Sequence, residues 1–370
     1  MHLLHVVGAR PNFMKAAPLL RALEMKKVHQ TLVHSGQHYD RNMSDVFFDQ
    51  LGIPEPDFNL HVGSGSHAQQ TAQIISRFEP VLLEEKPDGV IVYGDVNSTA
   101  AVAMVCAKLG TRSIHVEAGL RSFDRTMPEE INRLITDQLA DLLLTPSIDG
   151  NRNLQREGVP ASRVHMVGNI MIDTLVRLLP TAQARYAELR VLYGLQEFGL
   201  VTLHRPSNVD DITHLESIAQ TLERISADLP LLFPVHPRTR QRLAEHGLRL
   251  NRLKLIEPLP YIDFLALEQA ATMLITDSGG VQEETTYLGV PCLTVRENTE
   301  RPVTVTIGTN QLVGFDMKRL VDEARMILGG NGKMGAIPPL WDGKTAERIA
   351  ELLTARVVDE EEHLVGHQPC

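Results

Sequence analysis

Residues 273–284, MLITDSGGVQEE, contain the pattern that decides the fold. An apolar run ends at Asp277, three small residues follow, and a helical pattern begins. A strand that passes through a short turn into a helix is the unit of a parallel α/β sheet. The turn exposes backbone N–H groups suited to a diphosphate, and Glu284 stands where it can accept hydrogen bonds from two ribose hydroxyls. A structural role fits equally: Ser278 caps the helix and Glu284 faces water.

The same unit recurs along both halves of the chain. We expect strands near residues 3–7, 31–33, 89–93, 113–116 and 142–144, then near 200–203, 231–235, 253–256, 273–276 and 292–295. Residues 67–84, 98–109 and 344–355 have helical patterns, and 180–194 reads as a helix plus a connection. This predicts two Rossmann-like α/β domains, 1–168 and 169–355, with a helix at about 356–370 packing back on the first. Ligands of such folds bind at the carboxyl ends of the strands, so we expect the active site in the cleft between two facing sheets.

Composition, charge and residue spacing argue against several classes of function. The chain has 370 residues, 43% of them hydrophobic, and a net charge of −10 without a Lys/Arg run, which argues against nucleic acid as a partner. The apolar stretch near 100–107 is far shorter than the roughly 20 residues that span a bilayer, so no membrane association is expected. Three widely spaced cysteines, Cys106, Cys292 and Cys370, fit a reducing, cytoplasmic location. No histidine spacing indicates a metal site.

Acidic residues follow two strands of the first half. Asp95 comes directly after an apolar strand, where capping a helix is the alternative role. Glu117 also emerges from a strand end, and glutamate is not a preferred cap, which favours a functional role. Glu129 follows Pro128 at the start of a helix and stands four residues before Arg133, a spacing that also fits a stabilising helical pair.

Basic and imidazole groups occupy similar positions. Arg10 and Lys15 follow the first strand and can meet an anion together with helix-terminal amides; a turn with solvated charges is the alternative. His204 and His236 follow strands of the second half. The glycine-rich stretch 63–68 matches a dinucleotide pattern, but 56–59 reads as a poor strand, so no nicotinamide cofactor is expected.

Taken in order, these motifs resemble the non-hydrolysing UDP-N-acetylglucosamine 2-epimerases over nearly the whole chain. The matching strings are Gly8-Ala9-Arg10-Pro11 with Lys15, Ser35-Gly36-Gln37-His38, Gly94-Asp95, residues 115–121, Pro128-Glu129-Glu130 with Asn132-Arg133, His204-Arg205, Pro234-Val235-His236, residues 277–284 and Glu300-Arg301-Pro302. Departures are Pro206-Ser207-Asn208 after His204-Arg205 and Tyr39-Asp40 after Gln37-His38.

The resemblance implies a GT-B-like pair of domains, a homodimer, a UDP-sugar substrate, and neither cofactor nor metal. It assigns catalysis to Asp95, Glu117, Glu129 and His204. It assigns substrate binding to Arg10, Lys15, Arg133, His236, Phe264, Ser278, Gly279, Gly280, Glu284 and Arg301, with the diphosphate on the 278–280 turn, the ribose on Glu284 and uracil stacked on Phe264. Phe264 also fits a core position. Gln37 and His38 would belong to a regulatory second substrate site.

The implied reaction is reversible inversion of carbon 2 of UDP-N-acetylglucosamine through 2-acetamidoglucal and bound UDP, which supplies an activated amino sugar for cell-surface polysaccharide. Four alternatives stay open. They are a C2 epimerase of a modified UDP-diacetamido sugar, a hydrolysing 2-epimerase, a GT-B glycosyltransferase and a non-catalytic nucleotide-sugar sensor. Proton exchange at C2 in D2O separates the epimerases from the last two classes.

Overall fold

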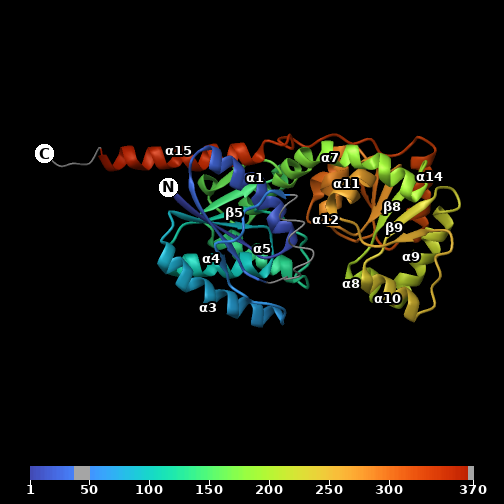
Figure 1. Cartoon of the computed structure of the whole chain (residues 1–370), viewed down its shortest axis with the longest axis horizontal. Helices are drawn as coiled ribbons and strands as arrows, with labels where there is room; N and C mark the ends of the chain where they lie inside the picture. The colour runs from blue at the N-terminus through green and yellow to red at the C-terminus, as the bar shows by residue number, and fades with distance from the viewer. Residues whose placement is uncertain (37–50, 366–370) are drawn as a thin grey trace. The chain divides into compact units, whose positions relative to one another are not determined.

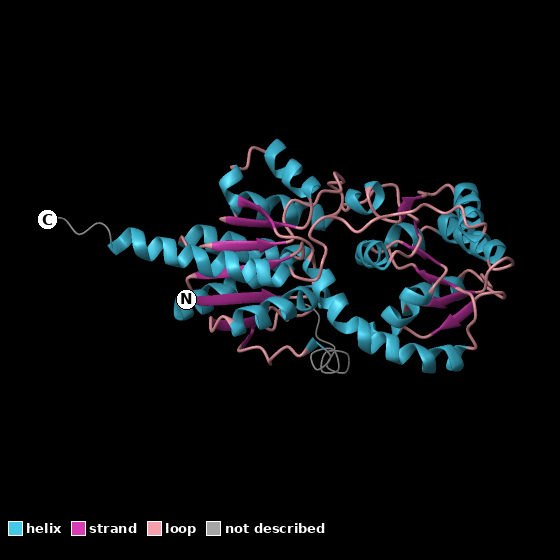
Figure 2. Ribbon diagram, turned by 90° about the horizontal axis from the view of Figure 1, so that it is seen from above, coloured by secondary structure: helices cyan, strands magenta, loops and turns pink. Residues whose placement is uncertain are grey.

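The computed structural model describes residues 1–36 and 51–365, which form two compact units (Figure 1). Unit 1 comprises Met1–Thr174 with Pro339–Cys370, and unit 2 comprises Leu175–Pro338. Each unit contains one parallel sheet with helices on both faces (Figure 2). The predicted fold class of two Rossmann-like α/β domains is therefore confirmed, whereas the division at residue 168 and the packing of 356–370 stay predictions.

The sheet of unit 1 has seven parallel strands in the order β3-β2-β1-β4-β5-β6-β7. Its central strands are buried on both faces, as their continuous Val, Ile and Leu runs require. The bounds are β1 His2–Val7, β2 His29–His34, β3 Phe58–Asn59, β4 Gly89–Tyr93, β5 Ser113–Val116, β6 Leu142–Thr145 and β7 Val164–Met166.

The described α-helices of unit 1 are α1 Arg10–Met25, α3 His67–Glu85, α4 Asn97–Leu109, α5 Pro128–Leu139, α6 Ile148–Arg156 and α15 Thr345–Val365, together with the start of α7, Ile170–Tyr193. Ser66 caps α3 by accepting a hydrogen bond from the Gln69 amide, and Pro128 occupies the first turn of α5. One hydrophobic core of this unit forms between the sheet and helices α3 and α4, around Phe78 and Val102.

Unit 2 has six parallel strands in the order β10-β9-β8-β11-β12-β13. The strands are β8 Gly199–Thr202, β9 Leu231–Pro234, β10 Lys254–Ile256, β11 Met273–Thr276, β12 Cys292–Thr294 and β13 Asn310–Leu312. The helices are α8 Pro206–Val209, α9 Ile212–Ile225, α10 Pro237–Glu245, α11 Tyr261–Ala270, α12 Gly279–Leu288, α13 Pro302–Thr306 and α14 Met317–Leu328. Apolar faces of α9 and α14 bury one side of this sheet.

Several elements differ from the sequence-based expectation. Residues 180–194 do not begin a helix, because α7 already starts at Ile170 and contains Pro180. Strands β3, β7 and β13 were not predicted, and each has only two or three residues, too few to show a period. Phe58–Asn59, taken as a poor strand, pairs with Val33 and His34 of β2.

The C-terminal helix returns to unit 1. Helix α15 packs against α1, and the Asp173 carboxylate of α7 accepts hydrogen bonds from the backbone N–H groups of Thr345 and Ala346 at 3.1 and 2.7 Å. Burial raises the pKa of Asp173 to about 6, against the lowering effect of these two donors. No described helix is long and apolar enough to cross a membrane.

Strand order identifies where each unit can bind a ligand. In unit 1 the order reverses between β1 and β4, and in unit 2 between β8 and β11. The loops that leave neighbouring strands diverge at such a switch point and open a crevice at the carboxyl ends. Arg10 begins the helix that follows β1, and Asp95 lies in the loop after β4; the loops after β8 and β11 carry His204 and Ser278.

Candidate active site

Lys15 and Glu117 form a buried ion pair at the switch point of unit 1. Lys15 Nζ lies 2.7 Å from Glu117 Oε2, and the two residues are only 4% and 5% exposed. Gly94, at φ +62°, makes room for this pair, because a Cβ there would lie 2.7 Å from Lys15 Nζ. The structure thus brings together two predicted site residues from helix α1 and the end of strand β5.

The backbone at Glu117 departs from a normal strand. Its φ is +76°, a left-handed conformation that costs a non-glycine residue about 1–3 kcal/mol. The N–H groups of Glu117 and Ala118 both donate to the Leu144 carbonyl at 3.0 Å, which holds this turn against β6. The strained turn directs Glu117 out of the strand, and backbone strain of this kind often accompanies function.

A buried network fixes the residues on either side of Glu117. His115 Nδ1 lies 2.6 Å from Asp137 Oδ1, and His115 Nε2 lies 2.7 Å from the Gly94 carbonyl. These two contacts fix the orientation of the imidazole ring through both of its nitrogens. Arg121 Nη1 donates to Asp137 Oδ2 at 2.7 Å.

Asp137 is a buried carboxylate between His115 and Arg121. Burial opposes its ionisation, but the His115 charge and hydrogen bond and Arg121 lower the pKa of Asp137 below its ordinary value. Sequence reasoning assigned no role to Asp137, because it lies in the last turn of α5 and only the fold brings it to β5.

Asp95 and Arg133 form the second ion pair of unit 1 between predicted site residues. The Arg133 guanidinium also contacts the buried Glu130 carboxylate, Nη2 to Oε2, at 2.6 Å. Burial alone would raise the pKa of Glu130, but hydrogen bonds from Ser122 and Arg133 lower this pKa below its ordinary value. The i,i+4 pairing of Glu129 with Arg133 that the sequence suggested is wrong, since Arg133 binds Glu130 and Asp95 instead.

The Glu129 side chain has a different setting. It is partly exposed, and among the described residues it makes no hydrogen bond or ion pair. The helix cap of α4 is Val96, so Asp95 does not have the capping role that its position also allowed. Asn132 Nδ2 donates to the Asp95 carbonyl at 2.9 Å, which ties this loop to α5.

The loop after β1 is held by Asn12, which sequence reasoning missed. Its Oδ1 accepts hydrogen bonds from the Gly8 and Ala9 amides at 3.1 and 3.0 Å, and its Nδ2 donates to the Tyr93 carbonyl at 2.8 Å. These bonds join the carboxyl ends of β1 and β4. Arg10, the first residue of α1, is exposed beside this junction.

In unit 2, His204 is oriented by Asp277. His204 Nδ1 lies 3.0 Å from Asp277 Oδ1, and the backbone N–H groups of His204 and Arg205 also donate to this carboxylate. The Asp277 side chain is fully buried, whereas that of His204 is 48% exposed. Burial opposes ionisation, but these donors lower the pKa of Asp277.

This arrangement defines what His204 can do. A carboxylate only accepts hydrogen bonds, so Nδ1 of His204 is the nitrogen that donates to Asp277. Nε2 is then the ring nitrogen that can contact a ligand. Sequence reasoning quoted Asp277 within a motif without assigning it this orienting role. The signal that could have found it was a charged residue directly after a buried strand.

The 278–280 turn begins α12 and presents the helix N-terminus. Ser278 is its N-cap residue but makes no side-chain capping bond. A Cβ at Gly279 would lie 2.5 Å from Arg301 Nη1 and 2.7 Å from Glu300 Oε1. A Cβ at Gly280 would meet no protein atom within 4 Å. Gly279 thus lets the Glu300–Arg301 pair approach the helix start, while Gly280 faces open space.

Charged side chains surround this turn. Arg301 Nε lies 2.8 Å from Glu283 Oε1, and Arg296 Nη2 lies 2.8 Å from Glu300 Oε2. Arg205 Nη2 is 3.7 Å from Glu300 Oε1. Three arginines therefore lie beside the positive end of a helix, where their N–H groups and the helix-terminal amides suit an anionic ligand.

The other predicted site residues of unit 2 differ in burial and in their hydrogen-bond partners. Glu284 is buried rather than facing water, and the Tyr261 hydroxyl donates to its Oε1 at 2.7 Å. Phe264 is half-buried on α11. His236 is exposed and caps α10, with Nδ1 accepting a hydrogen bond from the Arg238 amide at 3.3 Å. Gln37 and His38 lie outside the described residues.

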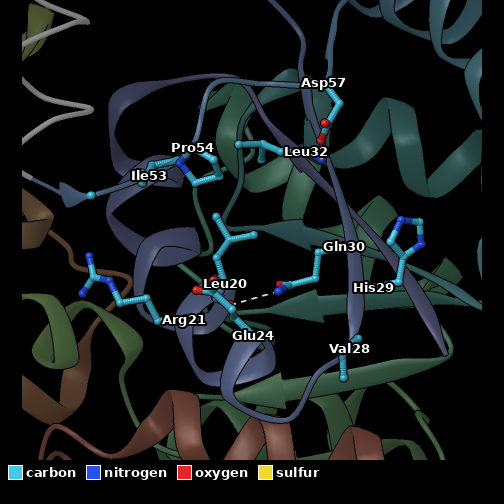
Figure 3. A pocket seen from close by; sticks show the side chains of 11 residues that line it. Leu20, Arg21, Glu24, Val28, His29, Gln30, Leu32, Ile53, Pro54 and Asp57 are labelled. Atoms are coloured by element: carbon cyan, nitrogen blue, oxygen red, sulfur yellow. Dashed lines mark hydrogen bonds between the residues drawn. The ribbon is translucent and has the colours of Figure 1, made fainter.

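A cavity of about 540 Å³ lies elsewhere in unit 1 (Figure 3). It is lined by Leu20, Arg21 and Glu24 of α1, residues 28–30 and 32, and residues 52–54 and 57. These include the first residues of β2, so the cavity lies toward the amino end of that strand. None of the predicted site residues that the structure describes lines it.

Known proteins provide an independent comparison. A family model described as UDP-N-acetylglucosamine 2-epimerase matches residues 21–354. A Methanocaldococcus jannaschii protein named UDP-N-acetylglucosamine 2-epimerase is 42% identical over 96% of this chain and 99% of its own length. A Pseudomonas aeruginosa protein named UDP-2,3-diacetamido-2,3-dideoxy-D-glucuronate 2-epimerase is 41% identical over 95% of this chain and 99% of its own.

A solved structure agrees with the sequence comparison. The crystal structure of the Methanocaldococcus jannaschii UDP-GlcNAc 2-epimerase, in complex with UDP-GlcNAc and UDP, has a TM-score of 0.88 to this protein at 42% identity. The match covers 96% of this chain and 100% of that one. The chain therefore belongs to the UDP-N-acetylglucosamine 2-epimerase family.

Proposed function

We propose that this protein interconverts UDP-N-acetylglucosamine and UDP-N-acetylmannosamine by eliminating and re-adding UDP. The observation that carries the proposal is the pair of carboxylates Asp95 and Glu117 at neighbouring strand ends, each ion-paired with a buried cation. Family membership and the 42% identical relative named as such an epimerase support the substrate.

The chemistry explains why several acids are needed. The hydrogen on sugar C2 is not acidified by a carbonyl, so its removal must accompany loss of a leaving group. A carboxylate of unit 1 takes the C2 proton, the C–H electrons form the C1=C2 bond of 2-acetamidoglucal, and the C1–O bond breaks to release UDP. UDP then re-adds at C1 while a second acid protonates C2 from the opposite face.

Unit 2 supplies the groups that bind the leaving diphosphate. We assign this role to the amides of the 278–280 turn with Arg301, and we place the uracil on Phe264 and the ribose on Glu284. His204, held by Asp277, presents Nε2 to the charge that develops on UDP. Arg10, Lys15, Arg133 and His236 complete the proposed substrate contacts. The mechanism requires no cofactor.

A second candidate is C2 epimerisation of a UDP-diacetamido sugar, favoured by the 41% identical Pseudomonas relative. The two reactions share the bond-breaking steps and differ in the substituents of the sugar. Parallel assays with UDP-N-acetylglucosamine and UDP-2,3-diacetamido-2,3-dideoxyglucuronate decide between them. Faster turnover of the first by at least 100-fold supports our proposal, and the reverse preference overturns it.

We also propose an oligomeric state, a cellular compartment and a biological role for the protein. We infer that the protein acts as a homodimer in a reducing, cytoplasmic compartment, where its product supplies an activated amino sugar for cell-surface polysaccharide. Cys106 and Cys292 are free and buried, which fits that compartment. Light scattering tests the dimer, and a monomer mass would contradict it. Loss of the surface amino sugar in a deletion strain tests the supply role.

A further inference from the structure

Glu268 is a buried acid of unit 2 that the proposed mechanism does not use. It lies on α11, which Figure 1 labels, with its side chain fully buried. Neither carboxyl oxygen accepts a hydrogen bond from a donor in the described part of the chain. A charged carboxylate without donors is strongly disfavoured in a protein interior, so this group is expected to be neutral.

The neighbour of Glu268 is Glu284 on α12, whose carboxyl is within hydrogen-bonding reach. Two carboxylates cannot bond to each other, because both only accept, so one of the pair must carry a proton. Glu284 accepts a hydrogen bond from the Tyr261 hydroxyl, which favours its charged form. The proton therefore belongs on Glu268.

The surroundings agree with this protonation. Burial first, and repulsion from Glu284 second, raise the pKa of Glu268 well above its ordinary value. Cys292 of β12 also lies near Glu268, and burial raises its pKa to about 12, so it stays a neutral thiol. The causes that act on the pKa of Glu268 itself are burial and Glu284, and they include no cation.

We propose that Glu268 is a positioning residue that, as a carboxylic acid, donates a hydrogen bond to Glu284 and holds it ready to accept the ribose hydroxyls of the nucleotide. Tyr261 and Glu268 approach Glu284 from two places on α11, which fixes the orientation of its carboxylate. The inference rests on the proposed role of Glu284 in binding the ribose, and it adds the residue that orients the Glu284 carboxylate for that role.

Substitutions at position 268 separate donation from simple packing. Glu268→Gln keeps an N–H donor of the same shape, whereas Glu268→Leu removes the donor and keeps most of the volume. Gln269→Leu, the next residue on α11, is a matched polar-to-apolar control. The readout is the Kd of 2′-deoxy-UDP divided by the Kd of UDP at pH 7.5, measured by calorimetry on the full chain.

Wild type, Glu268→Gln and the Gln269→Leu control should prefer UDP by about 10-fold, the scale of one hydrogen bond to a charged group. Glu268→Leu should bring the ratio near 1, chiefly by weakening UDP. Equal ratios in Leu and wild type, or equal losses in Gln and Leu, would overturn the inference. If the Leu variant does not fold, the Gln variant decides, because the inference requires its ratio to equal that of wild type.

Failure of the inference can be told apart from failure of the proposed function. A wild-type ratio near 1 would overturn the ribose role and with it the inference. Conversion of UDP-N-acetylglucosamine, followed separately by NMR in the same preparations, reports on epimerisation alone.

Discussion

Replacing Gly280 by alanine should weaken UDP binding without destabilising the protein. A Cβ at Gly280 would meet no protein atom within 4 Å, and the residue has no positive φ. Alanine in this first turn of α12 should therefore leave the free energy of unfolding unchanged or raise it by up to about 1 kcal/mol. The methyl group would stand where a diphosphate approaches the amides, so the Kd for UDP should rise by about 10-fold or more.

Gly279→Ala provides the contrast. Its Cβ would lie 2.5 Å from Arg301 Nη1, so the buried Glu300–Arg301 pair must shift, at a cost of about 1–3 kcal/mol. Denaturant unfolding and calorimetry with UDP and with uridine, which has no phosphate, measure both effects. Uridine affinity should be the same in wild type and Gly280→Ala. A folded Gly280→Ala variant that binds UDP as tightly as wild type would refute the assignment of the diphosphate to this turn.

Three further substitutions test individual contacts. Asp277→Asn should lower kcat about 100-fold because His204 loses its orienting carboxylate, and unchanged kcat at saturating substrate would contradict this. Because burial raises the pKa of Asp173, the free energy of unfolding should be highest below about pH 4 and decrease as pH rises through about 6. Asp173→Asn should remove this decrease of about 2–3 kcal/mol. Identical curves of unfolding free energy against pH for the variant and wild type would contradict the prediction. Asp137→Asn leaves His115 without its buried anion and should cost about 3–5 kcal/mol in urea unfolding; a loss below about 1 kcal/mol would contradict the network.

The fold was predictable because parallel strands buried on both faces appear as apolar runs. Strands β4, β5 and β11 begin and end where the sequence placed them. Pro180 misled the reading of α7, since a proline inside a helix is unfavourable unless tertiary contacts compensate. Short strands such as β13 have too few residues for a pattern.

The site was predictable only in part. Strand-end positions indicated Asp95 and Glu117, but the cations that pair with them depend on contacts far along the chain, as with Lys15 and Glu117. Helical spacing allowed Arg133 to pair with either of two consecutive glutamates, and burial selected Glu130. No local pattern indicated that Glu268 and Glu284 would meet, because each looks like an ordinary helical glutamate.

The central claim is that a carboxylate of unit 1 removes the C2 proton during reversible loss of UDP. Incubation with UDP-N-acetylglucosamine in D2O, followed by NMR of the sugar, tests it most directly. The product UDP-N-acetylmannosamine should carry deuterium at C2, and Glu117→Gln should slow its formation by at least about 100-fold while UDP still binds. Inversion with the original hydrogen retained at C2 would contradict the account.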